Sequence, residues 1–189
     1  MGLSINIELS DNDLDHFQEV LRRANQAAGS IDSHQITAAA GKLLESAAKA
    51  QVPEFIAERL GKLENLINMV HDLGWALPEE DKSRVLTALT YFADPEDVIP
   101  DSVPVVGFLD DAIMIELCVR ELKHELDAYQ DFCQFRAEQA QHRGEQDGPL
   151  LRADWMEDRR AELQDRMRRR RERESYTPRG GGGSLFRFR

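Results

Sequence analysis

Five aspartates stand close together in the middle of the chain, at Asp94, Asp97, Asp101, Asp110 and Asp111. Carboxylate oxygens are the ligands that Mg²⁺ and Ca²⁺ prefer, so a metal site is one interpretation of this segment. The spacing does not match an EF-hand loop, and no glycine-rich phosphate-binding loop accompanies it. Two other interpretations stay open. The aspartates can cap helices and form turns, which is the interpretation we favour, or they can present an acidic surface to a partner.

A second pattern with chemical meaning is Glu121 and His124, which have the spacing of one ligand pair in a di-iron helix bundle. Such a bundle needs a second Glu-x-x-His pair on another helix, and the sequence contains none. It also contains no nucleophile elbow, Walker loop or Cys-x-x-Cys motif. We therefore predict no catalytic residues and no cofactor, and we expect a protein that is not an enzyme. A metal-binding protein or metal-dependent enzyme that uses the aspartates stays the alternative.

The aspartates belong to an ordered motif. Its residues are Asp94, Pro95, Asp97, Ile99, Pro100, Asp101, Pro104, Gly107, Asp110 and Asp111. This motif resembles the YkvA-like family (domain of unknown function 1232) of bacteria and archaea, over about residues 88–120. The resemblance implies a helical domain in which this segment joins two helices, and it implies no established chemistry.

The prolines of the motif predict a corner between two helices. Each proline fixes its own φ and pushes the preceding residue out of the helical region, so the chain must turn repeatedly. Ile99 can fill the core of the corner. Gly107 gives backbone freedom just before Asp110 and Asp111, which we expect in the first turn of the next helix, where acidic side chains are stabilised.

Apolar residues at steps of three and four predict an all-α fold, a bundle of about five helices with this Pro/Asp-rich corner. The body spans residues 1–147, and its predicted helices begin at Asp11, Asp32, Pro53, Pro78 and Phe108. The last of them should run to about Arg143. Its apolar residues form a seam that can pack either neighbouring helices or a second copy of the chain, and in the second case residues 108–143 would form a homodimer interface. The seam consists of Ile115, Val119, Leu122, Leu126, Tyr129 and Cys133.

Charge is divided unevenly between the body and the C-terminal residues. Residues 1–151 carry 12 basic and 28 acidic residues, whereas residues 152–189 carry 12 arginines and 7 acidic residues. We predict an Arg-rich helix within residues 148–174, which should project or lie loosely on the body because it has few apolar residues. A Gly-rich tether with a terminal LFRFR peptide follows over residues 175–189. An acidic body repels nucleic acid and anionic lipid, so such contacts would have to use the basic tail.

The basic tail therefore carries the functional hypothesis. We interpret the chain as a cytoplasmic helical adaptor, at most peripheral to a membrane, which presents this tail to a protein partner. Binding of nucleic acid or an anionic membrane surface is an alternative, as are a solvated helical face, a plain flexible tail and an added GGGGS linker. The predicted contact residues are Arg168, Arg169, Arg170, Arg171, Leu185, Phe186, Arg187, Phe188 and Arg189.

Overall fold

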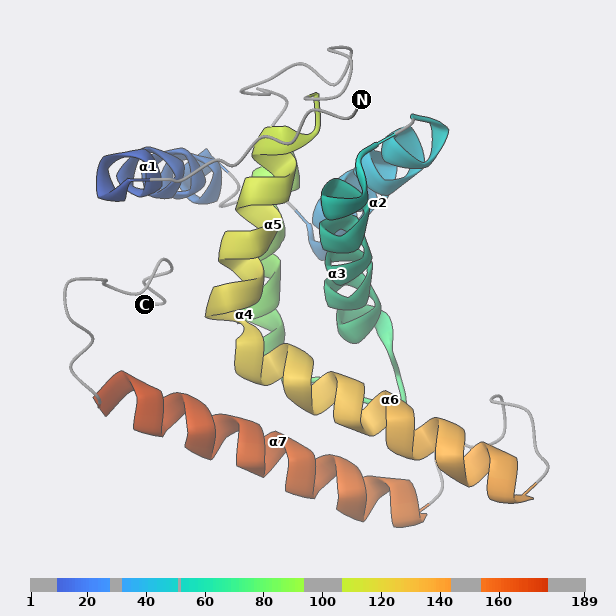
Figure 1. The fold of residues 1–189 in the computed structure, drawn as a ribbon. Coiled ribbons are helices and arrows are strands. Elements are labelled where there is room, and N and C mark those ends of the chain that lie inside the picture. Colours follow the sequence, from blue (N-terminus) through green and yellow to red (C-terminus); the bar gives the residue numbers. More distant parts are fainter. Residues whose placement is uncertain (1–9, 28–31, 51, 94–106, 144–153, 177–189) are drawn as a thin grey trace.

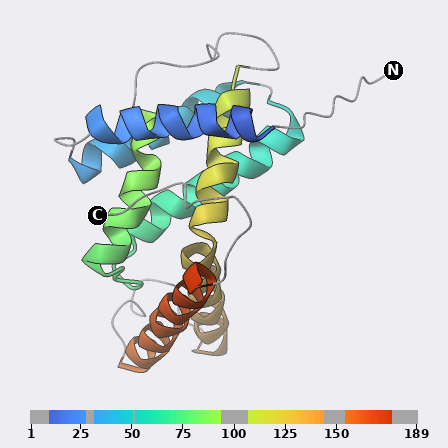
Figure 2. The ribbon, with the colours of Figure 1, turned by 90° about the vertical axis from the view of Figure 1, so that its left-hand side faces the viewer.

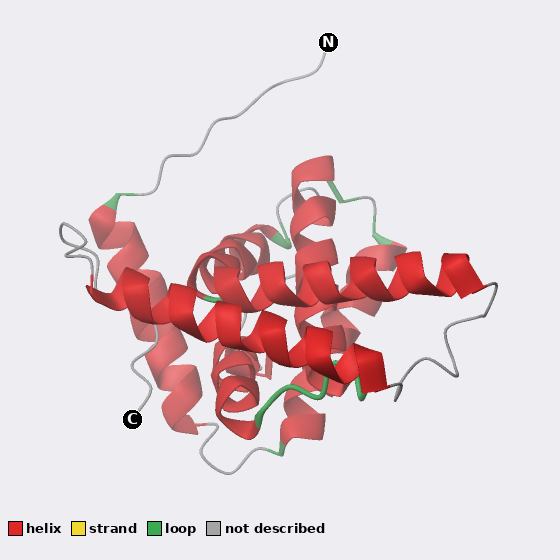
Figure 3. Cartoon of the chain, turned by 90° about the horizontal axis from the view of Figure 1, so that it is seen from below, coloured by secondary structure: helices red, strands yellow, loops and turns green. Residues whose placement is uncertain are grey.

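The computed structural model describes residues 10–27, 32–50, 52–93, 107–143 and 154–176, and these residues form helices without any strand (Figure 3). The described part of the chain is therefore all-α, as the apolar periodicity predicts. The elements are α1 (Asp11–Ala27), α2 (Ser33–Lys49), α3 (Glu54–His71), α4 (Glu79–Leu89), the 3-10 helix η1 (Thr90–Ala93), α5 (Leu109–Glu121), α6 (Lys123–Arg143) and α7 (Asp154–Tyr176).

Local sequence signals determine where several helices begin. Asp32 precedes α2, and its backbone N–H donates to the side-chain oxygen of Gln35 at 3.3 Å, which completes a capping box. Pro53 and Pro78 stand immediately before α3 and α4. A proline at such a position loses no helical hydrogen bond, because the first N–H groups of a helix have no partner within it. These three starts are confirmed.

The prediction of a single helix over residues 108–143 is wrong, because the structure divides this range into α5 and α6 at Leu122. Leu122 has φ −98° and ψ 23°, and α6 leaves α5 at a pronounced angle (Figures 1 and 2). Hydrogen bonds continue through the bend, since the N–H of Leu122 donates to Cys118 at 2.9 Å and the N–H of Leu126 donates to Leu122 at 3.0 Å. The bend has a packing reason. It lets α5 lie against α3 while α6 covers α7 and the connection after α3, which one straight rod could not do.

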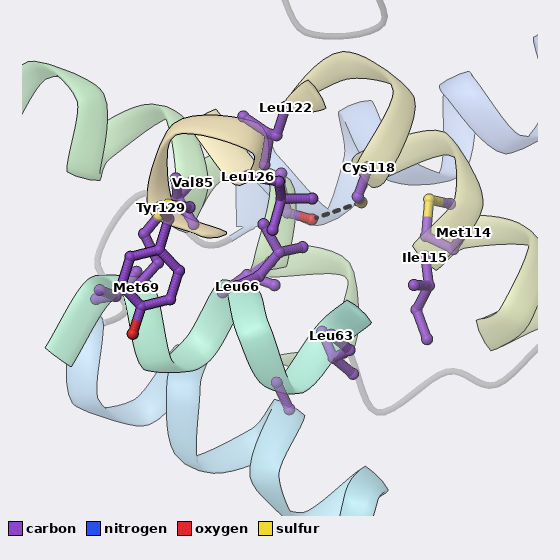
Figure 4. Close-up of a cluster of buried hydrophobic side chains, with 14 of the residues drawn as sticks. Leu63, Leu66, Met69, Val85, Met114, Ile115, Cys118, Leu122, Leu126 and Tyr129 are labelled. Carbon is purple, nitrogen blue, oxygen red and sulfur yellow. Dashed lines mark hydrogen bonds between the residues drawn. The ribbon is translucent and has the colours of Figure 1, made fainter. Parts of the chain in front are cut away.

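The core lies where α3, α4, α5 and the first turns of α6 meet (Figure 4). Of the predicted seam, Ile115, Leu122, Leu126 and Tyr129 are buried in the core of their own chain. The seam therefore packs neighbouring helices, which is one of its two expected uses. The homodimer stays a prediction.

Cys118 is a core residue whose thiol donates to the backbone oxygen of Ala88 at 3.4 Å. Burial raises its pKa to about 12, because a thiolate would lose its hydration there. It stays a neutral thiol and packs as a small apolar side chain. Cys118 and Cys133 are both free.

The connection between α3 and α4 folds inward around Trp75. This indole is fully buried, with its ring centroid 5.9 Å from that of Tyr129 and 5.2 Å from that of Phe132. Asp72 shapes the connection, because its Oδ1 accepts the backbone N–H groups of Gly74 at 2.8 Å and Trp75 at 3.1 Å. This Asx-type turn directs the large aromatic ring into the core.

The connection also contains a strained position, since Ala76 has a φ of 45°. A side chain carrying Cβ is disfavoured there by about 1 kcal/mol, and glycine is not. We expect Ala76→Gly to raise the free energy of unfolding by up to about 1 kcal/mol. The exposed Ala38 in α2 is the matched control, where the same change should lower it by a similar amount. Urea unfolding followed by circular dichroism measures both, and a destabilising Ala76→Gly would contradict the account.

Candidate functional site

The Arg-rich helix α7 runs antiparallel along α6, below the body formed by the earlier helices (Figures 1 and 2). Among its described side chains, Met156, Leu163 and Met167 are buried, at steps of seven and four residues. They form a narrow apolar stripe of the kind that one helix buries against another. This corrects the expectation that the helix projects or lies loosely on the body.

Arginines add a second contact between α7 and the body. Two carboxylates of the body receive them, Asp81 of α4 at 1% side-chain exposure and Glu125 of α6 at 0%. Arg171 donates to both, at 2.7 Å to Asp81 and 2.9 Å to Glu125. Arg168 donates to Asp81 at 3.3 Å, and Arg84 of α4 donates to Glu125 at 3.2 Å. We call these five residues the inner cluster.

The inner cluster contains three guanidinium groups and two carboxylates. A buried carboxylate is tolerated only where it is paired and hydrogen-bonded, because it has lost its hydration. The carboxylates act on their partner in return. Burial alone would lower the pKa of Arg171, but the hydrogen bonds from this guanidinium to Asp81 and Glu125 outweigh burial and raise it. The Arg171 guanidinium therefore stays charged, and the ion pairs of the cluster join α4, α6 and α7.

The N-terminal half of α7 fixes the connection that contains Trp75. The side-chain amide of Gln164 donates to the backbone oxygen of Trp75 at 2.9 Å, and Arg160 donates to that of Gly74 at 3.4 Å. Backbone oxygens in a buried connection need such donors. This half of α7 therefore contacts the body through hydrogen bonds to backbone oxygens, whereas the C-terminal half contacts it through ion pairs.

The same connection is held from α6 by a group around Asp72. Its carboxylate accepts the hydroxyl of Tyr129 at 3.1 Å and Arg136 at 2.9 and 3.1 Å. Burial, with the neighbouring Cys133 and Asp72, raises the pKa of Tyr129. The hydroxyl therefore stays protonated and donates. The Asp72 carboxylate is saturated with donors, so its role is to shape the connection.

Two further contacts hold α7 to α6. Nε2 of His124 lies 2.5 Å from Oε2 of Glu174, and Arg166 pairs with Asp131. His124 has the spacing of a di-iron ligand pair with Glu121, but no such site is predicted, because the sequence contains no second pair. The structure places His124 against a carboxylate of α7.

The predicted contact arginines separate into two groups. Arg168 and Arg171 turn inward to the cluster, whereas Arg169 and Arg170 are exposed, together with Arg173. The terminal residues Leu185, Phe186, Arg187, Phe188 and Arg189 lie outside the described residues.

The motif corner is described only at its end. Gly107 is buried just before α5, and Asp110 and Asp111 lie in its first turn, as predicted. The described ranges contain no group of three or more His, Cys, Asp or Glu residues that could hold a metal ion. The rest of the corner lies outside the described residues, namely Asp94, Pro95, Asp97, Ile99, Pro100, Asp101 and Pro104.

Sequence reasoning missed Asp81, Arg84 and Glu125. A signal for Glu125 was present, because it follows Leu122 by three residues and precedes Tyr129 by four, which is the spacing of the apolar seam. An acidic residue on a buried helix face requires a cationic partner. Asp81 gave no such signal, since an acidic residue in a first helical turn is usually explained by the helix itself.

Comparison with known proteins finds one family, described as "Protein of unknown function (DUF1232)", whose model matches residues 81–117. No curated protein and no solved structure matches the chain. Within the described residues, none of the helices is both long enough and apolar enough to cross a membrane. The matched segment begins at Asp81 and contains most of α4 with Arg84, all of η1 and most of α5, so two members of the inner cluster stand at its start. Over these residues the chain is similar to that family, in agreement with the resemblance of the motif.

Proposed function

We propose that this protein is a non-enzymatic helical adaptor whose α7 presents an arginine face to an acidic protein partner. One observation carries the proposal, namely that the arginines of α7 divide between two sides of the helix. Those facing inward fix α7 on the body, and those facing outward are held in a defined position.

Helix geometry explains the division. Successive residues are about 100° apart around an α-helix, so Arg169, Arg170 and Arg173 fall within an arc of about 100°. Arg168 and Arg171 lie on the other side. The side chain of Arg169 is 71% exposed, and its carboxylate neighbour on the same helix is 3.8 Å away. We call the three exposed residues the outer arginine face. Because α7 is docked, the backbone that carries this face is held in place, which lowers the entropy lost on binding.

The charge of the whole molecule favours an acidic patch on a protein over a nucleic acid. The body carries a large excess of acidic residues, which repels a phosphate polymer at long range. Three arginines provide a small contact, which suits a patch of a few carboxylates. Contact with a nucleic acid or an anionic membrane surface would use the same face, and the test includes probes for both.

The test compares the tagged full-length protein with a variant that carries Arg169→Gln, Arg170→Gln and Arg173→Gln. The matched control neutralises three exposed arginines elsewhere, Arg22, Arg23 and Arg120. Partners recovered from cells are identified by mass spectrometry, and each is then titrated with the purified proteins. Three exposed ion pairs at about 0.5 kcal/mol each predict a roughly tenfold loss of affinity in the first variant.

The control should bind like the wild type. Equal binding by all three proteins would refute the proposal. Binding to single-stranded DNA or to anionic vesicles that is steeply salt-dependent and lost in the first variant would move the assignment from protein to phosphate.

A further inference from the structure

We infer that Asp81 of α4 and Glu125 of α6 form a socket for arginine, that α7 is a displaceable occupant of this socket, and that the socket binds an arginine-bearing amphipathic helix of a partner protein in place of α7. The inference does not depend on the outer arginine face, because it concerns the opposite side of α7 and the surface beneath it.

The socket is acidic once α7 is removed. Among the described residues, both guanidinium groups that contact Asp81 come from α7, at 2.7 Å from Arg171 and 3.3 Å from Arg168. Glu125 shares its cations between α7 and Arg84 of the body. With α7 docked, three guanidinium groups face two carboxylates. Without it, one guanidinium faces two carboxylates, so the open surface attracts a cation.

The body can tolerate an open socket. Glu125 would keep its contact with Arg84, which comes from α4 and not from α7. Asp81 stands in the first turn of α4, where the free N–H groups and the helix dipole stabilise a carboxylate. Undocking also returns water to both groups. Neither carboxylate is left buried and uncompensated, which is the arrangement that makes a broken ion pair costly.

The hold of α7 on the body is weaker than that of a core helix. Its described part buries three apolar side chains, whereas α3 buries six. The rest of its described contact consists of hydrogen bonds to two backbone oxygens and of ion pairs, and in a buried ion pair the lost hydration offsets most of the attraction. A partner helix with a similar set of side chains can therefore compete with α7.

The contacts of α7 with the body define which partner helix would fit the socket. The apolar side chains of Leu163 and Met167 are four residues apart, and the inward arginines follow the second of them by one and four residues. Gln164 adds a donor to the backbone oxygen of Trp75. The expected partner segment is therefore a helix with two apolar residues at i and i+4 and arginines at i+5 and i+8. The negative body would attract such a basic segment and speed its association.

The experiment measures competition between α7 and a helix supplied in trans. The probe is a fluorescently labelled peptide of residues 154–176. The receptors are the full-length wild type, the full-length R168Q/R171Q variant and that variant with Asp81→Asn added. We expect the peptide to bind R168Q/R171Q at least tenfold more tightly than the wild type, because the resident helix competes less. Adding Asp81→Asn should remove most of that gain.

Two control peptides test the recognition pattern. A peptide with Arg168→Gln and Arg171→Gln should bind at least tenfold more weakly than the unmodified one. A peptide with Arg169→Gln and Arg170→Gln removes the same charge from the outer face and should bind nearly as well. The full-length R169Q/R170Q/R173Q variant should accept the probe as the wild type does, so a failed adaptor proposal and a failed socket are told apart.

Circular dichroism melts establish that each receptor is folded. If R168Q/R171Q does not fold, Arg168→Lys with Arg171→Lys replaces it, since lysine keeps the charge but lacks the planar guanidinium group with its several fixed donors. Equal peptide affinity in the wild type and the weakened variant, or binding that ignores Asp81→Asn, would overturn the inference. A wild-type dimer that dissociates in R168Q/R171Q would overturn the assignment to a partner, because a second copy of α7 would then be the occupant.

Discussion

Replacing Trp75 by alanine should lower the free energy of unfolding by about 4 kcal/mol. The indole is fully buried and packs on Tyr129 and Phe132. Its removal loses both transfer energy and packing, and truncation of a buried Trp or Phe typically costs about 3–5 kcal/mol. It should also loosen α7, because Gln164 binds the backbone at this position. Urea unfolding followed by far-UV circular dichroism measures the loss.

The chain provides a control two residues away. Leu73 lies in the same connection but is 75% exposed. Leu73→Ala should change the free energy of unfolding by less than about 0.5 kcal/mol, as is usual for surface substitutions. Similar losses at both positions would mean that the connection is not folded inward as the structure places it.

The second large effect is expected from Glu125→Ala, which removes the acidic residue of the inner cluster on α6 and should lower the free energy of unfolding. Glu125→Ala removes one ion-pair partner from Arg84 and one from Arg171, which keeps its contact with Asp81. Truncation of one member of a buried ion pair costs about 3–5 kcal/mol, since the remaining charges stay desolvated. We expect a loss of about 3 kcal/mol, near the lower limit, because α7 can move outward and rehydrate them.

The control for Glu125 lies on the same helix. Glu138 is exposed, and its contact is with Gln134 one turn away. Glu138→Ala keeps the chemistry of the substitution but involves no buried charge, so it should cost less than about 0.5 kcal/mol. A small loss in Glu125→Ala would show that the cluster adds nothing to the docking of α7.

The positions of the helices follow from local sequence. Asp32 with Gln35, and the prolines at 53 and 78, act within one turn of the chain, so their effect is visible in the residues themselves. Apolar residues at steps of three and four likewise show which face of each helix is buried. For the same reason Asp110 and Asp111 could be placed in a first helical turn from the sequence.

The remaining features depend on contacts between segments far apart in the chain. No residue around Leu122 signals a bend in the sequence. The bend is required by tertiary packing, because α5 and α6 must cover different neighbours. The apolar seam shows that these helices are buried, but it does not show what covers them. The docking of α7 was underestimated for two reasons. Its apolar stripe contains three residues, and its arginines were expected to face solvent.

The opposite charges of body and tail were visible in the sequence, yet the pairing of Arg171 with Asp81 spans 90 positions. Sequence shows that a run of arginines exists, and helix geometry shows that such a run divides between two faces. Only the tertiary packing decides which face meets carboxylates. The sequence therefore predicted these arginines as one set of contact residues, and the structure separates Arg168 and Arg171 from Arg169 and Arg170.

The pairing of α7 with the body is the central claim, and a double-mutant cycle between Asp81→Asn and Arg171→Gln tests it most directly. Free energies of unfolding are measured for the wild type, the two single variants and the double variant. The account predicts a coupling energy of about 1–3 kcal/mol, as found for residues in direct contact within one ion-pair network. The parallel cycle of Asp81→Asn with the exposed Arg169→Gln should give a coupling below about 0.5 kcal/mol. Additive effects in the first cycle would contradict the account, because α7 would then not be docked in the arginine socket of α4 and α6.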